Sequence, residues 1–378
     1  MKNNILIIEN SLLPSRGGIE KVSDTLSKLF EEKGYQCFFA YRFVDNPNYP
    51  EHKKIFLSTH DKTKNIYKKL KKFIEENNIK YIINQNMTGE KFFFIFKNIK
   101  KDNKDIRIIT CLHNTPNYIN YISKPNSFKI RLIIKFKQIL YRKKNIYIAE
   151  QQKLYNLSDK YVVLSETFIP EAVRIFQLKS QSKLISITNP IALTQPNITQ
   201  KKKQVLIVAR FDEAQKNILS ALRIWEIVSK QVHDWQLKII GYGDMFYEYQ
   251  NFIKSNNIKN IILTGEREDP MKYYSQSSIF MMTSRYEGLC LTLIEALQNQ
   301  CVPIAFSTFS SLQDIIINQV NGIIIPPYEE KKYANEMIKL MSNPNLLAEY
   351  QKQSYITLEK FSPELIINQW INLFKSIY

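Results

Sequence analysis

Long apolar runs are missing from this sequence. None approaches the roughly 18 uninterrupted residues that a helix needs to cross a bilayer. The apolar block Ile5–Ile8, which follows Met1–Asn4, is too short for the apolar region of a signal peptide. It predicts a first buried strand instead, so we expect a cytoplasmic protein.

Paired cysteines and acidic metal motifs are missing as well. The four cysteines, Cys37, Cys111, Cys290 and Cys301, lie far apart, with no C-x-x-C spacing and no nearby pair of histidines. This pattern argues against a disulfide framework or a zinc site and favours four ordinary thiols. No Asp-x-Asp follows a predicted strand, and no short-period repeat is present. We therefore expect no metal.

The composition is that of an ordered globular protein. With 378 residues and 44% hydrophobic residues, the chain is too long for one comfortable core and about right for two domains. Short apolar runs alternate with longer amphipathic stretches, which favours an α/β protein with parallel sheets covered on both faces. We expect strands at Asn4–Glu9, Gln36–Tyr41, Tyr81–Asn84, Arg107–Leu112, Tyr161–Leu164, Gln204–Val208, Gln236–Ile240, Asn260–Leu263, Ile279–Met282, Val302–Ala305 and Gly322–Ile325. Helices are expected at Ile19–Lys33, Thr63–Asn77, Ser220–Val232, Phe246–Asn256, Thr292–Gln300 and Glu330–Met341.

A break between two domains is expected near Thr188–Lys203. This stretch contains Asn189-Pro190, Gln195-Pro196 and the basic run Lys201–Lys203, with little periodic apolar patterning. It divides the chain into two doubly wound domains of similar size, residues 1–190 and 191–360. Ligands of such sheets bind beyond the carboxyl ends of the strands, so we expect the active site in a cleft between the two domains.

Positive charge is concentrated in the first half of the chain. The formal net charge is +18, and residues 1–190 hold 34 Lys and Arg against 17 Asp and Glu, whereas residues 191–378 hold 19 against 18. Such asymmetry indicates that the first half meets an anionic surface. Nucleic acid and anionic lipid are both candidates, and composition does not choose between them.

Two carboxylates flank a loop in the second half. Glu287 and Glu295 are eight residues apart, and the loop Gly288–Leu291 leads into a predicted helix. Eight helical steps would rise about 12 Å, so the two carboxylates cannot share one reacting atom, and two separate roles are implied. The free backbone N–H groups of the loop and the helix N-terminus form a ready site for a diphosphate, which Gly288 lets approach closely.

Two cations follow a predicted strand. Arg210 and Lys216 are six residues apart in the stretch Val208–Asn217, on a loop at the carboxyl end of that strand. From there they can converge on one pyrophosphate and stabilise a leaving nucleoside diphosphate. The alternative is an ordinary surface arginine and lysine.

Two features of the first half point the same way. Gly17 and Gly18 lie between the first predicted strand and the first predicted helix, where backbone amides can approach a phosphate with the helix dipole behind them. His113 follows the strand expected at Arg107–Leu112 and would face the cleft. A tight turn and a structural histidine are the plainer alternatives.

Together these motifs resemble family 4 retaining glycosyltransferases. The stretch Thr283–Leu297 is similar to the family's E-x7-E signature, with Cys290 at its second glycine, and Val208–Asn217 is similar to its G-R-x5-K-[GN] element, with Ala209 at the glycine. The stretch Pro14–Glu20 matches the P-x-x-G-G-x-E loop of the family. The resemblance covers nearly the whole chain and is strongest over residues 204–328.

The resemblance implies a GT-B fold, in which two Rossmann-like doubly wound domains face each other across a cleft. Residues 1–190 would bind the acceptor, residues 191–360 the nucleotide sugar, and a helix in residues 361–378 would cross back to the first domain. The family roles carried to this chain place Glu287 and His113 at the donor sugar, Glu295 at the ribose hydroxyls, and Arg210 and Lys216 at the departing diphosphate. The donor-binding residues implied in addition are Gly17, Gly18, Gly288, Leu289, Cys290, Leu291, Gly241 and Gly265.

The reaction implied is transfer of a hexose or N-acetylhexosamine, with retention, from a nucleoside-diphosphate sugar to a hydroxyl. The nucleotide is expected to be UDP, and the acceptor a cell-envelope glycan such as lipopolysaccharide, capsule or a lipid-linked oligosaccharide. Apart from the sugar nucleotide as co-substrate, no cofactor or metal is expected, because positive side chains and helix N-termini can do the work of a cation.

The basic half contains two segments suited to a membrane surface. Residues 62–72 and 128–144 concentrate lysine and arginine, and in the second segment an apolar stripe follows helical spacing beside Arg131, Lys135 and Arg142. The stripe is Phe128, Leu132, Phe136, Ile139 and Leu140. We expect these segments to dock on anionic headgroups at the inner face of the cytoplasmic membrane. The alternative is a core helix with a solvated basic face.

Three other functions compete with this interpretation. A second GT-B enzyme class, the 2-epimerases of UDP-N-acetylglucosamine, would use the same donor site. A basic nucleic-acid-binding protein fits the charge, although the sequence has no aromatic-basic motif of a known kind. A catalytically inactive glycan-binding relative is disfavoured by the intact Arg210, Lys216, Glu287 and Glu295.

Overall fold

A computed structural model of the chain describes residues 3–14, 17–43, 49–85, 87–122, 133–191, 200–267 and 269–377. Contacts group the chain into two compact units. Unit 1 comprises Met1–Ile191 together with Pro363–Tyr378, and unit 2 comprises Ala192–Ser362. The sequence predicts domains at residues 1–190 and 191–360. That these ranges fold as separate domains stays a prediction.

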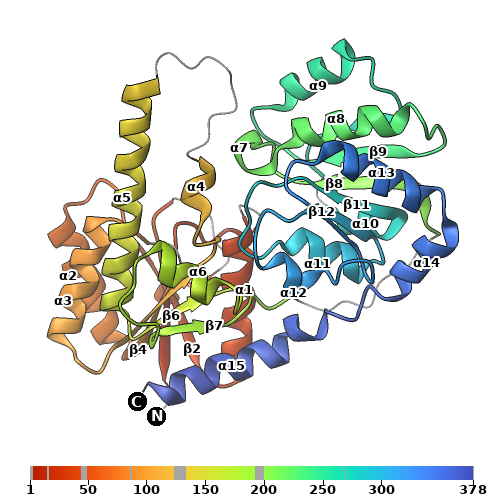
Figure 1. The fold of residues 1–378 in the computed structure, drawn as a ribbon. Coiled ribbons are helices and arrows are strands. Elements are labelled where there is room, and N and C mark those ends of the chain that lie inside the picture. Colours follow the sequence, from red (N-terminus) through yellow and green to blue (C-terminus); the bar gives the residue numbers. More distant parts are fainter. Residues whose placement is uncertain are drawn as a thin grey trace. The chain divides into compact units, whose positions relative to one another are not determined.

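Unit 1 is built on a parallel sheet of seven strands in the order β3-β2-β1-β4-β5-β6-β7 (Figure 1). The strands are β1 (Asn4–Ile8), β2 (Gln36–Tyr41), β3 (Lys54–Phe56), β4 (Ile79–Asn84), β5 (Arg107–Leu112), β6 (Lys160–Val163) and β7 (Leu184–Ser186). Side chains of β1 from Ile5 to Ile8 are fully buried, because helices cover both faces of a parallel sheet. The chain runs outward from β1 to β3 and then returns to β4, so the strand order reverses between β1 and β4.

The helices of unit 1 follow the strands in alternation. They are α1 (Gly18–Glu32), α2 (Thr63–Glu76), α3 (Glu90–Asp102), α4 (Tyr118–Ile122), α5 (Ile133–Leu157) and α6 (Phe168–Ile175), with a 3-10 turn η2 (Glu51–Lys53). In α1 the buried positions Val22, Leu26 and Phe30 are four residues apart, which places them on one face of the helix.

The last helix of the chain belongs to unit 1. In α15 (Pro363–Ser376), the ring of Phe374 stacks on Tyr81 of β4 at 4.1 Å between centroids and on Phe30 of α1 at 5.4 Å. The Nε of Arg107, at the start of β5, donates a hydrogen bond of 2.7 Å to the Ile377 carbonyl. Aromatic packing and this hydrogen bond hold the C-terminal segment on the first sheet.

Unit 2 contains a second parallel sheet, of six strands in the order β10-β9-β8-β11-β12-β13. The strands are β8 (Lys202–Val208), β9 (Gln236–Ile240), β10 (Ile261–Leu263), β11 (Ser277–Met282), β12 (Val302–Phe306) and β13 (Ile323–Ile325). The helices are α7 (Glu213–Lys216), α8 (Ile218–Ser229), α9 (Phe246–Ser255), α10 (Met271–Gln276), α11 (Leu291–Gln298), α12 (Leu312–Ile315), α13 (Glu330–Met341) and α14 (Pro344–Lys352), with the 3-10 turn η4 (Glu359–Phe361). Here the strand order reverses between β8 and β11.

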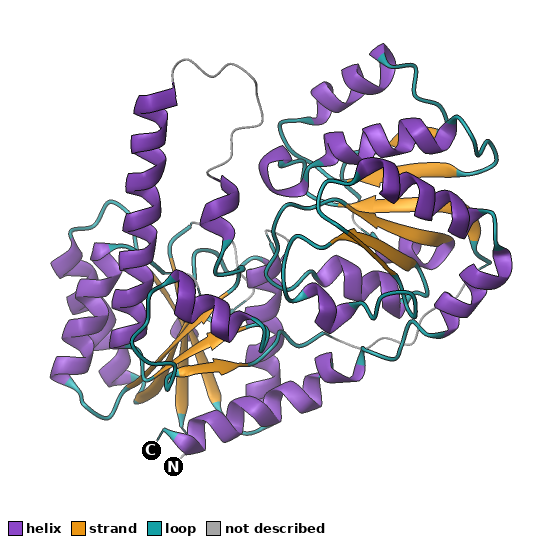
Figure 2. Cartoon of the chain, in the orientation of Figure 1, coloured by secondary structure: helices purple, strands orange, loops and turns teal. Residues whose placement is uncertain are grey.

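The core of unit 2 lies under α8 and α13, which pack against each other. Trp225 of α8 and Tyr333 of α13 are fully buried. The Tyr333 hydroxyl donates to the Ile304 carbonyl of β12 and accepts from the backbone N–H of Met282, so a buried polar group is satisfied between two strands. The coloured elements in Figure 2 show strands enclosed by helices in each unit.

The expected fold class is confirmed: both sheets are parallel and doubly wound. Two strands were not expected, β3 and β7, each of three residues at an edge of the first sheet. Within the described part of the chain, no helix combines the length and the apolar character needed to span a membrane. The predicted apolar stripe, Phe128, Leu132, Phe136, Ile139 and Leu140, lies outside the residues whose side chains the structure describes.

Candidate functional site

In unit 2, the candidate residues gather where the strand order reverses. The chain leaves β8 towards α7 with Arg210 and Lys216, and leaves β11 towards α11 with Glu287 and Glu295. Because β8 and β11 are neighbours, the loops after them leave the same edge of the sheet side by side. Such reversal points are where open parallel sheets bind ligands.

An ion pair joins the two loops. The Nζ of Lys216 lies 2.6 Å from Oε1 of Glu287, and the two side chains are only 16% and 9% exposed. Burial alone would lower the pKa of Lys216, but the adjacent Glu287 carboxylate outweighs it and raises that pKa above its ordinary value. The lysine is therefore a fixed positive charge over the whole neutral range.

Gln215 and Arg210 extend this pair. The Nε2 of Gln215 donates to the other carboxylate oxygen of Glu287 at 3.2 Å and to the Tyr286 carbonyl at 3.3 Å. Its Oε1 accepts from Nη2 of Arg210 at 3.3 Å, and Arg210 is exposed. A chain of contacts thus runs from the exposed guanidinium to the buried carboxylate. Gln215 was not among the predicted site residues, because its partner lies 72 residues away in the sequence.

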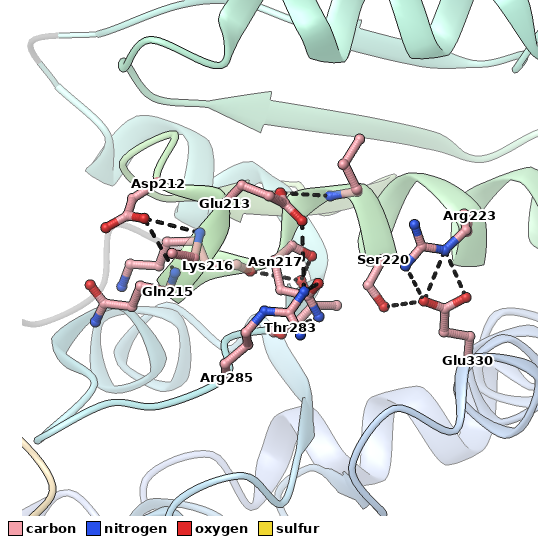
Figure 3. A network of polar contacts seen from close by, with 12 residues as sticks. Asp212, Glu213, Gln215, Lys216, Asn217, Ser220, Arg223, Thr283, Arg285 and Glu330 are labelled. Atoms are coloured by element: carbon pink, nitrogen blue, oxygen red, sulfur yellow. Dashed lines mark hydrogen bonds and ion pairs between the residues drawn. The ribbon is translucent and has the colours of Figure 1, made fainter. Parts of the chain in front are cut away.

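The loop that carries Lys216 is ordered by its own residues. The Oδ1 of Asp212 accepts from the backbone N–H groups of Ala214 and Gln215 and begins the single turn α7. Asn217 ends the turn in the left-handed region at φ 52°, a conformation that asparagine adopts more readily than most residues. This geometry also starts α8, so Lys216 stands at a sharp corner between two helices (Figure 3).

The second loop leads into α11. Gly288, Leu289 and Cys290 are buried, and Cys290 stands at the N-cap of α11. Among the residues that the structure describes, none accepts a hydrogen bond from the backbone N–H groups of Leu289, Cys290 or Leu291. A helix N-terminus with free donors favours an anion. Burial raises the pKa of the Cys290 thiol to about 12, so this residue adds no charge to the loop.

Glu295 lies on α11, one turn beyond this N-terminus, and is half-buried. It stands close to the buried Tyr274 of α10: burial raises the pKa of Tyr274, and the nearby Glu295 carboxylate raises it further. Glu287 and Glu295 therefore occupy different elements, the loop and the helix. The two separate roles expected for them stay a prediction.

Gly241, after β9, and Gly265, after β10, are each explained by the local backbone structure. A Cβ at position 241 would lie 1.8 Å from the Ala209 carbonyl oxygen, so only glycine lets the turn after β9 pass the loop after β8. The backbone N–H of Gly241 donates to the Gly265 carbonyl at 3.1 Å, and Gly265 has a φ of +73°. Whether either glycine also contacts a ligand stays a prediction.

In unit 1, the candidate residues follow β1 and β5, at the carboxyl end of the sheet whose strand order reverses between β1 and β4. Gly17 is the N-cap of α1, which follows β1, and its φ of −177° is open to any residue, so no turn requires a glycine there. His113 follows β5, and its Nε2 lies 2.6 Å from Oε1 of the buried Gln85, which follows β4. Gln85 is a further residue that was not predicted, since nothing in its local sequence marks it.

His113 is neutral in this setting. Burial lowers the pKa of His113 to about 4, well below the ordinary value for histidine. The hydrogen bond to Gln85 occupies Nε2, and Nδ1 has no partner among the described residues. With Nε2 donating to Gln85, Nδ1 is the acceptor nitrogen of the neutral ring, and it is buried.

The structure thus brings Arg210, Lys216 and Glu287 together in unit 2, and Gly17, Gly18 and His113 to one edge of the sheet in unit 1. Across the described ranges, no group of three or more His, Cys, Asp or Glu is placed to hold a metal ion. The site in unit 2 can bind and stabilise an anion, because its cations and the free N–H groups at the helix N-terminus lie close together.

Comparison with known proteins identifies the architecture. Residues 190–357 match the family described as glycosyl transferases group 1. The amylovoran biosynthesis glycosyltransferase AmsD of Erwinia amylovora is 25% identical over 374 residues, which cover 95% of this chain and 96% of that protein.

Two solved structures share the fold. The lipopolysaccharide outer core galactosyltransferase WaaB superposes with a TM-score of 0.74 at 16% identity, covering 99% of this chain and all of that one. The pneumococcal O-GlcNAc transferase GtfA, in complex with UDP and GlcNAc, gives a TM-score of 0.75 at 12% identity, covering 100% of this chain and 99% of that one.

Proposed function

We propose that this chain, a glycosyltransferase of GT-B fold whose residues 190–357 match the family described as glycosyl transferases group 1, transfers a sugar from a UDP-sugar to a hydroxyl of a cell-envelope glycan. The sugar would be a hexose or N-acetylhexosamine, moved with retention of its anomeric configuration. The observation that carries the proposal is the buried Lys216–Glu287 pair at the reversal of the second sheet, with Arg210 joined to it through Gln215.

The donor diphosphate would lie across the loops after β8 and β11. Lys216 and Arg210 supply two positive charges, and the N-terminus of α11 supplies backbone donors. These groups stabilise the negative charge that develops on the diphosphate as its bond to the anomeric carbon breaks. The acceptor oxygen then bonds that carbon, and the hydroxyl proton leaves with the departing phosphate oxygen. The charges of this site support a reaction without a metal.

Glu287 would orient the donor sugar, and Glu295 would bind the ribose. The Glu287 carboxylate is held at both oxygens, by Lys216 and Gln215, so it has a fixed direction. When a diphosphate draws the Lys216 ammonium towards itself, one Glu287 oxygen becomes available to a sugar hydroxyl. His113 would be a further residue at the donor sugar, and Gly17 and Gly18 would approach the phosphates.

The acceptor side would work at an anionic lipid surface. On α2 the exposed lysines Lys64, Lys68 and Lys72 are spaced by four residues, so they form one stripe. On the neighbouring α3, Lys97 and Lys101 are exposed, and between the two helices Phe94 is 40% exposed with its ring edge-on to Tyr67. Lysines around an exposed aromatic suit a headgroup layer, and we propose that this α2–α3 face docks on the inner face of the cytoplasmic membrane.

The test of the donor site is calorimetric binding of UDP-, GDP- and ADP-sugars to the purified chain. It avoids the need for the acceptor. We expect micromolar affinity for the UDP series, at least about tenfold weaker in Arg210→Ala, since a charge-assisted contact to phosphate is lost. Arg174→Ala removes another exposed arginine, from unit 1, and should bind as the wild type does. Absence of binding to every sugar nucleotide would overturn the proposal.

A further inference from the structure

Arg285 stands two residues before Glu287, but its side chain contacts other residues (Figure 3). Its Nη2 donates a hydrogen bond of 2.5 Å to Oδ1 of Asn217 and lies 4.0 Å from Oε1 of Glu213. The guanidinium carbon is 5.6 Å from the ring centroid of Tyr328, a cation–π distance. Only 17% of the side chain is exposed.

The backbone of Arg285 holds the same two loops together. Its N–H donates to the Gln215 carbonyl at 2.7 Å. Beside it, Nδ2 of Asn217 donates to the Thr283 carbonyl at 3.2 Å, and the Thr283 hydroxyl bonds the carbonyls of Lys216 and Asn217 at 3.1 and 3.0 Å. The loops after β8 and β11 are therefore connected on both sides of the Lys216–Glu287 pair.

Asn217 is the point through which this network reaches the donor site. Its left-handed backbone sets the corner at which Lys216 leaves α7, and its side chain is bonded at both polar atoms, by Arg285 and by Thr283. A left-handed asparagine costs conformational free energy that the surrounding contacts must offset. If the contact with Arg285 is lost, the corner loosens and the Lys216 ammonium is no longer held 2.6 Å from Glu287.

Glu213 fixes the far end of the network. Its Oε2 accepts from the backbone N–H of Leu219 at 3.1 Å and from the Tyr249 hydroxyl at 3.0 Å. Burial raises the pKa of Glu213, against the opposing effect of these hydrogen bonds and of Arg285. Since Glu213 and Arg285 are both largely buried, their attraction is less screened than that of a surface pair.

We propose that Arg285 is a positioning residue of the donor site: through Asn217 it places Lys216 against the diphosphate and Glu287 against the sugar. This inference rests on the proposed function. It assigns Arg285 no contact with the substrate. An arginine at this position is required for its planar guanidinium, which reaches Asn217, Glu213 and Tyr328 at once.

The test compares two arginine truncations in one unit. Arg285→Ala removes the network, and Arg223→Ala removes the hydrogen-bonded pair that Arg223 forms with Glu330, visible in the same view but centred on α8 and α13 (Figure 3). UDP and uridine are titrated into each variant, by calorimetry and by ligand-observed NMR, and thermal melting confirms that each is folded. Uridine lacks the diphosphate and so does not report on Lys216.

We expect Arg285→Ala to weaken UDP binding about tenfold while uridine binding is unchanged, and Arg223→Ala to change neither. Equal losses for UDP and uridine would mean a merely structural role and would overturn the inference. If Arg285→Ala does not fold, the variant Asn217→Gly tests the inference instead. Glycine keeps the left-handed backbone at this corner and removes only the hydrogen bonds of the asparagine side chain. It should reproduce the UDP-specific loss, and unchanged UDP binding would refute the inference.

The two proposals fail in different ways. If the wild-type chain binds no nucleotide, the proposed function falls and the inference falls with it. If the wild type binds UDP and both Arg285→Ala and Asn217→Gly bind it equally well, the donor site stands and the positioning role is wrong.

Discussion

At the scale of single residues, the buried pair of Lys216 and Glu287 couples stability to the proposed function. Two charges that are 16% and 9% exposed have lost most of their hydration, which their mutual attraction and the bond from Gln215 must offset. A buried ion pair of this kind adds little to the free energy of folding. Its presence is better explained by a role in binding a third charged group, the diphosphate, during the reaction.

The pair predicts an asymmetric effect of substitution. Lys216→Met leaves the Glu287 carboxylate buried without its cation and should destabilise unit 2 by about 3–5 kcal/mol, whereas the double variant Lys216→Met/Glu287→Gln should recover most of that loss. Urea unfolding followed by tryptophan fluorescence measures both, since Trp225 lies in the core of this unit. A double variant less stable than Lys216→Met would contradict the account.

Gly241 gives a second prediction at this scale. Gly241→Ala places a Cβ 1.8 Å from the Ala209 carbonyl oxygen, so the turn must shift, at a cost of about 1–3 kcal/mol or more. Gly34→Ala is the control, since it has a positive φ of +87° but no atom within 4 Å of the new Cβ. Thermal melting should show the larger loss for Gly241→Ala, and the reverse order would mean that the turn after β9 is not constrained by the loop after β8.

His113 gives a prediction about pH. Its pKa is lowered by burial to about 4 in the folded chain, against about 6.5 when unfolded, so the unfolded chain binds the proton first as the pH falls. Stability is therefore fully present above pH 6.5 and is lost as the pH falls from about 6.5 towards 4. The loss from this residue is up to roughly 3 kcal/mol.

Urea unfolding at a series of pH values measures this loss. His113→Gln cannot take up the proton and should show a flatter dependence than the wild type over that window. Identical pH dependence in the two proteins would show that His113 is not held neutral by its surroundings.

At the scale of elements, the sequence was most informative where patterns are long. Alternating strands and helices predicted both sheets, and β2, β5 and β9 have the expected bounds. The edge strands β3 and β7 were missed because three residues carry too little periodicity, and their place depends on pairing with β2 and β6. The loop after β8 was expected without helix, but Asp212 caps the short turn α7 in it.

Some residues of the candidate site could likewise be predicted from the sequence, and others could not. Arg210, Lys216 and Glu287 could be found because each stands in a short motif next to a strand. Gln215, Gln85 and Arg285 could not, because their roles depend on partners 28 to 72 residues away that only the fold brings near. Local sequence pattern thus identifies residues that we propose to meet a ligand more readily than residues that hold them in place.

The helix α15 gives a prediction at the element scale. Phe374→Ala removes the ring stacked between Tyr81 and Phe30 and should destabilise unit 1 by about 3–5 kcal/mol. Leu365→Ala, on the same helix but 42% exposed, should cost far less. Urea unfolding of the two variants tests this, and equal stabilities would mean that α15 is not anchored through Phe374.

At the scale of the whole molecule, charge is the property that sequence alone interprets least well. Residues 1–190 carry 17 more cationic than anionic groups by formal count, but several lysines are paired, such as Lys71 with Asp102 and Lys100 with Asp159. Among the unit 1 residues that the structure describes, α2 and α3 together carry a group of exposed lysines, which include Lys64, Lys68 and Lys97.

This face predicts membrane binding that depends on lipid charge. Lys64→Glu/Lys68→Glu/Lys72→Glu should weaken sedimentation with vesicles rich in phosphatidylglycerol by about tenfold or more, since each near-surface charge contributes about 1 kcal/mol. The matched control reverses Lys331, Lys332 and Lys339 on α13, with the same change in net charge. Equal loss in both variants would mean that net charge, and not the α2–α3 face, is responsible. Binding to RNA but not to vesicles would favour a nucleic-acid partner.

The most direct test of the central claim is transfer itself. The purified chain is incubated with UDP-hexoses and UDP-N-acetylhexosamines and with a bacterial glycolipid extract, and UDP release and the anomeric proton of the product are followed by NMR. We predict acceptor-dependent UDP release and an α-configured product from an α-configured donor, both lost in Arg210→Ala. A product of inverted configuration would contradict the proposed mechanism, and no UDP release with any donor would contradict the proposed function.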